Sequence, residues 1–128
     1  KKSYRPSFCI LVYPVISMTD KLTHMGSKYS FMGKSPRDEE VHFFSNELQI
    51  SAEKTPPTLL IHAIDDAVVI PENSILYHKA LQENKIPTRL HLMEQGGHGF
   101  GIKNALAPTN SWLKITKEWL KNQKIIAH

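Results

Sequence analysis

Cysteine is nearly absent from this chain, and several classes of protein are excluded by what is missing. Cys9 is the single cysteine and lies inside an apolar run, so no disulfide can form within the chain, although this leaves the cellular location open. No stretch approaches the roughly 18 consecutive apolar residues that span a bilayer, and we expect no membrane association. The start shows no secretory signal, but a leader removed upstream would leave the same sequence, so the localisation stays unknown.

Clusters of basic residues are scarce as well. The formal charge is +4 and the isoelectric point about 9.2, yet the lysines are scattered and Lys1–Lys2 is the one adjacent basic pair. We interpret this excess as a solvated surface and expect no nucleic-acid partner. None of the seven histidines has the His-x-x-x-His spacing of a helical metal site. His62, beside two aspartates, is the weak alternative for a metal ligand; we expect neither a metal nor a cofactor, because no phosphate-binding loop is present either.

The patterning that is present indicates an α/β fold. The chain has 128 residues, of which 41% are apolar and 22% charged, as in one soluble domain with a sizeable core. Apolar runs typical of short buried strands cover Ser7–Tyr13, Thr58–His62 and Thr88–Met93. Helix-start signals stand at Ser35–Pro36, Pro71–Glu72 and Pro108–Thr109. Strands alternating with helices predict a three-layer sandwich with parallel strands. A long polar connection, 16–34, follows the first strand and is of a length that is usually functional or disordered.

One stretch, Gln95–Gly101, is the first candidate for chemistry. Four glycines surround His98 directly after the third strand. Glycine allows positive φ and close approach, and histidine exchanges a proton near neutral pH. A histidine in such a loop at a strand end indicates a functional site. The alternative is a tight turn with an incidental imidazole.

A pair of carboxylates follows the second strand in the same way. Asp65 and Asp66 leave Thr58–His62, and the carboxyl ends of neighbouring parallel strands meet at one edge of a sheet. A carboxylate bonded to one imidazole nitrogen fixes the tautomer and stabilises the imidazolium. On spacing alone either aspartate fits this role with His98. The alternative is that both belong to a loop turn.

These segments resemble a known fold. The matching segments are Pro56–Thr58, His62–Asp66, Val68–Val69, Pro71–Ser74 and Gly96–Gly101, with Val12–Met18 resembling the strand after the nucleophile region. They are similar to the C-terminal half of the α/β-hydrolase fold, in the branch of acetyl-xylan and feruloyl esterases related to dienelactone hydrolases and prolyl oligopeptidases. The resemblance implies that Asp66 is the acid and His98 the base of a Ser-His-Asp triad. It also implies a carboxylic ester as substrate, such as an acyl group on a plant polysaccharide.

The nucleophile of that family does not occur in this sequence. The family's serine lies in a Gly-x-Ser-x-Gly motif that precedes the acid and base, and no serine here has those flanking glycines. We therefore expect residues 1–128 to form a single partial hydrolase domain that lacks the nucleophile-bearing half and does not hydrolyse esters alone. The alternative is a catalytically inactive interaction module. In either case the strand near Phe8–Tyr13 lacks a neighbour, and we expect it to pair with a second copy or to be covered by another segment.

Overall fold

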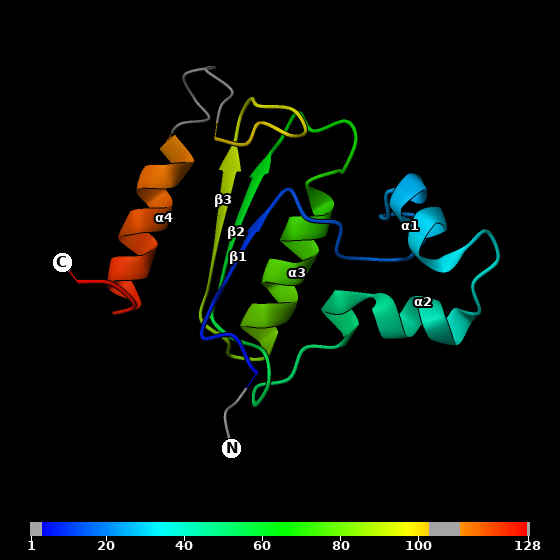
Figure 1. Ribbon diagram of the computed structural model, residues 1–128, viewed down its shortest axis with the longest axis horizontal. Coiled ribbons are helices and arrows are strands. Elements are labelled where there is room, and N and C mark those ends of the chain that lie inside the picture. The colour runs from blue at the N-terminus through cyan, green and yellow to red at the C-terminus, as the bar shows by residue number, and fades with distance from the viewer. Residues whose placement is uncertain (1–3, 103–110, 128) are drawn as a thin grey trace.

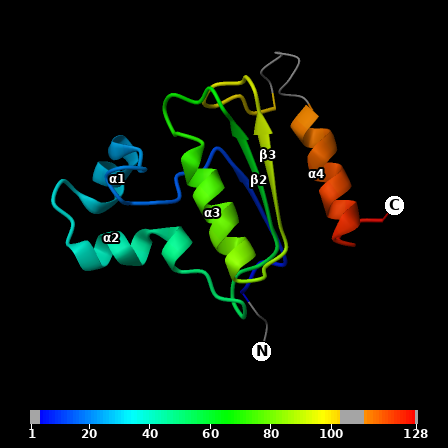
Figure 2. The ribbon, with the colours of Figure 1, turned by 180° about the vertical axis from the view of Figure 1, so that it is seen from behind.

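The structure is a computed structural model that describes residues 4–102 and 111–127, and its centre is a parallel sheet between two helices. The strands, in the spatial order β1-β2-β3, are β1 (Cys9–Val12), β2 (Thr58–Ala63) and β3 (Thr88–Met93). Helix α3 (Glu72–Glu83) covers one face of the sheet, and α4 (Ser111–Asn122) covers the other (Figures 1 and 2). The expected three-layer α/β fold with parallel strands is confirmed.

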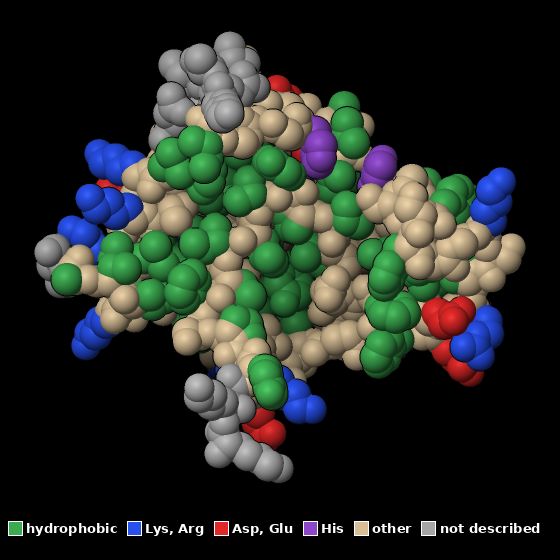
Figure 3. Space-filling view, in the orientation of Figure 1, with side chains coloured by type: hydrophobic (Ala, Val, Ile, Leu, Met, Phe, Trp, Pro, Cys, Tyr) green, Lys and Arg blue, Asp and Glu red, His purple; other side chains and the backbone are tan. Residues whose placement is uncertain are grey.

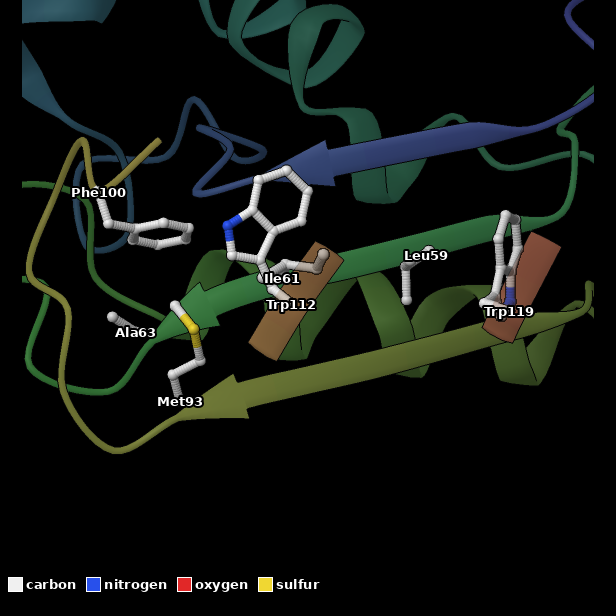
Figure 4. Close-up of a cluster of buried hydrophobic side chains, with 7 residues drawn as sticks. All are labelled: Leu59, Ile61, Ala63, Met93, Phe100, Trp112 and Trp119. Atoms are coloured by element: carbon white, nitrogen blue, oxygen red, sulfur yellow. The ribbon is translucent and has the colours of Figure 1, made fainter. Parts of the chain in front are cut away.

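Strand β2 forms the middle of the core because its side chains alternate between the two faces. All six of its residues are buried. Leu59, Ile61 and Ala63 pack in the cluster that contains Trp112 and Trp119 of α4 (Figure 4). On the opposite face, Leu60 packs with Leu81 of α3 and with Ile86. A continuous apolar run is therefore required here, since both faces of the strand are covered.

The segment between β1 and β2 differs from the sequence expectation. The connection 16–34 contains a helix, α1 (Met25–Met32), which begins after His24, whose ring Nδ1 accepts from Ser27 N at 3.2 Å. The next helix, α2 (Asp38–Phe44), begins at Asp38 rather than at Pro36, with the Glu40 carboxylate accepting from Arg37 N at 2.9 Å. A 3-10 turn, η1 (Asn46–Leu48), follows. These elements lie beside α3, away from α4 (Figure 1).

One buried amide ties this segment to α3. Asn73 is fully buried, and its Oδ1 accepts from Ile16 N at 2.9 Å and from Ser17 N at 3.1 Å. Its Nδ2 donates to Leu22 O at 2.7 Å. The chain that follows β1 is thus anchored at the N-terminal turn of α3, where four buried polar groups pair with one another instead of with water.

The C-terminal helix packs on the sheet through its two tryptophans. Trp112 and Trp119 are buried, whereas Leu113 is 39% exposed. The predicted cap at Pro108–Thr109 lies outside the described residues. Within the described ranges, no helix has the length and apolar character needed to cross a membrane.

Strand β1 forms one edge of the sheet. It pairs with β2 in parallel register, and no described strand pairs with its other side. All four of its residues are only half-buried. Figure 3, in which β1 lies toward the viewer, shows apolar side chains across the middle of this face. An unpaired strand flanked by apolar side chains is a surface that another polypeptide segment can cover.

Candidate active site

The site lies where the three strands end. Strands β2 and β3 run in register to their last pair, Ala63 and Met93, and Ile64 N continues the pairing with a bond to Met93 O at 2.7 Å. The loop after β2 carries Asp66, and the loop after β3 carries His98. His98 Nδ1–H donates to Asp66 Oδ2 at 2.9 Å. The residues that the resemblance designates as acid and base are therefore in direct contact.

The Asp66 carboxylate is buried and held by its own loop. The residue is 3% exposed, and Oδ1 accepts from Val68 N at 3.0 Å and from Val69 N at 2.9 Å. Burial raises the pKa of Asp66, but the hydrogen bonds from His98 and from the two valine amides lower it further, so the pKa lies below its usual value. Asp66 is consequently ionised at neutral pH and able to orient an imidazole.

His98 is presented on a glycine loop that Asp65 holds in place. Gly97 has φ of 60° and Gly99 has φ of 76°, conformations that residues with a Cβ rarely adopt. Asp65 Oδ1 accepts from Gly97 N at 2.8 Å. The His98 side chain is 32% accessible, and its Nε2 is the ring nitrogen not engaged by Asp66. Spacing left the choice of aspartate open; in the structure Asp66 contacts the ring, whereas Asp65 contacts the backbone of the loop.

Two aromatic residues support the loop: Phe100, which belongs to the predicted stretch Gln95–Gly101, and Tyr13, which sequence reasoning did not assign to the site. Tyr13 follows β1 with φ of 42°, which is unusual for a large side chain and is found preferentially at functional sites. Its ring centroid is 4.9 Å from that of His98 and 4.8 Å from that of Phe100. Phe100 is 1% exposed and also contacts Trp112 edge-on. Only its position in the sequence could have indicated this role of Tyr13, because the residue ends an apolar run and therefore lies at the same edge of the sheet as the two loops.

His62, the weak metal candidate, is engaged in hydrogen bonds through both ring nitrogens. It is fully buried, with Nδ1 at 2.7 Å from Ser74 Oγ and Nε2 at 2.8 Å from Val69 O. In residues 4–102 and 111–127, no group of three or more histidine, cysteine, aspartate or glutamate side chains is placed to hold a metal ion. Its environment is that of a structural histidine next to the Asp66 carboxylate.

Comparison with known proteins places this geometry in a family. The profile of the prolyl oligopeptidase family matches residues 7–124. The chain belongs to this family. Over 121 residues it is 32% identical to an acetylxylan esterase from Xylanibacter ruminicola, and over 102 residues 41% identical to an endo-1,4-beta-xylanase B from Butyrivibrio fibrisolvens. These matches cover 92% and 80% of this chain but only 25% and 16% of the respective relatives.

A solved structure extends the same likeness to three dimensions. The acetyl ester-xyloside bifunctional hydrolase from Caldicellulosiruptor lactoaceticus superposes with a TM-score of 0.91 at 36% sequence identity, covering 96% of this chain and 44% of that one. A carboxylesterase from Lactobacillus plantarum, at 21% identity and a TM-score of 0.78, shares the fold. The resemblance to the hydrolase family that contains acetylxylan esterases is confirmed, and this chain spans less than half the length of these proteins.

The ionised state of Asp66 predicts a dependence of stability on pH. Because its pKa is lower in the folded than in the unfolded chain, Asp66 stabilises the fold above the unfolded value of about 3.9, and this contribution is lost as the pH falls through the folded value. We expect Asp66→Asn to lower the free energy of unfolding by about 1–3 kcal/mol at pH 7. The difference from the parent chain should shrink as the pH falls through the folded pKa. Urea unfolding between pH 2.5 and 7 measures this.

The matched control is Asp38→Asn, which changes an exposed aspartate in the first turn of α2. This variant should follow the parent chain at every pH to within about 0.5 kcal/mol. A constant stability difference between Asp66→Asn and the parent across the whole range would contradict the assignment, because it would show that the ionisation of this carboxyl is not linked to folding.

Proposed function

We propose that this chain supplies the acid and the base of a serine hydrolase that acts on carboxylic esters, with Asp66 as the acid and His98 as the base. The observation that carries the proposal is the 2.9 Å bond between a buried carboxylate and an accessible imidazole. Asp66 holds the proton on Nδ1, which leaves Nε2 to accept the proton of an attacking serine hydroxyl. Nε2 then returns this proton to the leaving alcohol, while the carboxylate stabilises the imidazolium formed in between.

The proposed substrate is an acyl ester on a polysaccharide, most simply an acetyl group on xylan. Support comes from the relatives, which include an acetylxylan esterase and an acetyl ester-xyloside hydrolase. This step rests on family analogy, because one hydrolase fold serves many esters.

The serine is proposed to lie outside residues 1–128. The sequence contains no Gly-x-Ser-x-Gly motif, and this chain covers 44% of the Caldicellulosiruptor lactoaceticus hydrolase. In this proposal the chain is a partial hydrolase domain, and its activity depends on a polypeptide that carries the nucleophile. Removing the nucleophile from a triad leaves at most weak residual catalysis.

The test compares the chain alone with a completed version. In the second protein, called here the fusion hydrolase, this chain is joined behind the part of the Caldicellulosiruptor lactoaceticus enzyme that it does not cover. We expect the chain alone to hydrolyse p-nitrophenyl acetate no faster than buffer and to resist a fluorophosphonate probe. The fusion hydrolase should turn over the ester and be labelled at one serine outside this chain. Stoichiometric labelling of the chain alone, or a folded but inert fusion hydrolase, would overturn the proposal.

A second candidate function is a catalytically inactive interaction module, and the unpaired edge of β1 favours it. In this case two copies associate along the half-buried residues of β1. Sedimentation velocity from about 1 to about 200 µM, a range that detects micromolar dissociation constants, should show a rising dimer fraction. A monomer throughout this range would contradict self-association through the edge.

A further inference from the structure

The buried ring of His62 lies against the Asp66 carboxylate and is hydrogen-bonded to the backbone of the Asp66 loop. His62 Nε2 lies 2.8 Å from Val69 O and 3.2 Å from Asp66 Oδ2. The amide of the same Val69 donates to Asp66 Oδ1 at 2.9 Å. His62 is thus hydrogen-bonded to Val69, which is hydrogen-bonded to one carboxylate oxygen of Asp66, and the same ring nitrogen lies close to the other oxygen.

The partners of His62 determine where its proton lies. A backbone carbonyl and an ionised carboxylate can only accept, so Nε2 must carry a hydrogen whether the ring is neutral or protonated. The other nitrogen, Nδ1, lies 2.7 Å from Ser74 Oγ in α3. In the neutral ring the Ser74 hydroxyl donates to Nδ1 and fixes the tautomer, as second partners of functional imidazoles commonly do.

His62 is placed by the alternation of β2. Its side chain lies on the α3 face of the sheet together with Leu60, whereas Leu59 and Ile61 face α4. The ring is fully buried there. A polar ring at such a position is costly unless both nitrogens are paired, and both are. A leucine would fill this position equally well, so packing does not explain the histidine. Its contact with the Asp66 carboxylate does.

We infer that His62 is a positioning residue for the Asp66–His98 pair, acting as a buried N–H donor that keeps the Asp66 carboxylate ionised and directed at His98. Oδ1 has two donors in the valine amides, Oδ2 accepts from His98 Nδ1, and the buried N–H of His62 lies 3.2 Å from Oδ2. N–H groups directed at or placed beside a carboxylate favour its charged form over the protonated form. This role deepens the proposed function and rests on it for its catalytic meaning.

Removing the His62 donor should change the ionisation of Asp66 in a predictable direction. Oδ2 would then keep only the bond from His98, so the protonated carboxyl would become easier to form and the pKa of Asp66 would rise. The titratable side chains that face this carboxyl in the described residues are His62 from β2 and His98 from the loop after β3. Asp65 adjoins it in the chain, and Tyr13 contacts the His98 ring.

The experiment titrates Asp66 in the full chain by carbon-13 NMR of its carboxyl group and compares two substitutions of His62. His62→Leu fills a similar volume without a donor, and we expect it to lower the acid dissociation constant of Asp66 about tenfold. His62→Gln places an amide N–H near the former Nε2, and we expect it to stay within about twofold of the parent. His78→Leu is the control, since His78 lies in the middle of α3 and contacts Thr88 at the start of β3.

The outcomes separate positioning from packing. The inference would be overturned if Asp66 had the same pKa in the parent and in His62→Leu. It would also be overturned if His62→Leu and His62→Gln shifted this pKa equally, because the N–H donor would then be irrelevant. If His62→Leu does not fold, His62→Met is measured instead. It also removes the N–H near Asp66 Oδ2 and should lower the dissociation constant in the same direction, and an unchanged value overturns the inference. The measurement involves no ester turnover, so a failed serine assay would count against the proposed function and not against this role.

Discussion

Replacing His98 by alanine is expected to lower the kcat of the fusion hydrolase toward p-nitrophenyl acetate by at least about 10³-fold, because the serine loses the base that accepts its proton. The KM should change little, since the imidazole acts on the hydroxyl rather than on the acyl group. Steady-state kinetics at pH 7.5, with circular dichroism to confirm folding, measure both quantities.

The matched control is His78→Ala. His78 is also a partly buried histidine, but it bonds to Thr88 Oγ1 at 3.1 Å and lies on α3 rather than at the strand ends. It should retain activity within about threefold of the parent fusion hydrolase. A loss of less than tenfold for His98→Ala would show that another group acts as the base, and a comparable loss in both variants would indicate a general structural defect.

The second large effect concerns the anchor of the His98 loop. Phe100 is 1% exposed and lies edge-on to Tyr13 at 4.8 Å and to Trp112 at 6.4 Å. Deleting a buried phenylalanine ring removes apolar burial and leaves a cavity, so we expect Phe100→Ala to lower the free energy of unfolding by about 3–5 kcal/mol. Urea unfolding at pH 7, monitored by the fluorescence of the buried tryptophans, measures this loss.

The matched control for Phe100→Ala is the same substitution at an exposed phenylalanine. Phe43 in α2 is 65% exposed, and Phe43→Ala should change the free energy of unfolding by no more than about 0.5 kcal/mol. The ring of Phe100 also fixes the position of Tyr13, which contacts His98. A loss below about 1 kcal/mol in Phe100→Ala would mean that the loop is held by its backbone bonds and not by this ring.

The sheet and α3 could be predicted from the sequence because each has a local signal. Thr58–Ala63 is apolar on both faces, which is the pattern of a central parallel strand, and α3 begins at the predicted start, Pro71–Glu72. Helix α1 was missed because its apolar residues do not follow a helical period, and its one buried residue is Lys28. What stabilises that segment is tertiary, namely the Asn73 amide that holds the chain between β1 and α1.

The site was only partly predictable. The two loops could be found from their glycines and aspartates, but spacing could not separate Asp65 from Asp66, and the choice came from the resemblance. Three-dimensional contacts distinguish them, since Asp66 is buried against two valine amides and Asp65 contacts Gly97 N. The role of Tyr13 depends on its φ of 42°, a backbone conformation that no local motif in the sequence indicates.

The central claim is that Asp66 and His98 act as one unit on a serine supplied from outside this chain. A double-mutant cycle in the fusion hydrolase tests it most directly, using Asp66→Asn, His98→Ala and the two combined. Residues that work as a unit are strongly non-additive. We predict that the double variant is no slower than His98→Ala alone, to within about threefold, because the carboxylate acts only through the ring. A double variant whose loss equals the product of the two single losses would contradict the account.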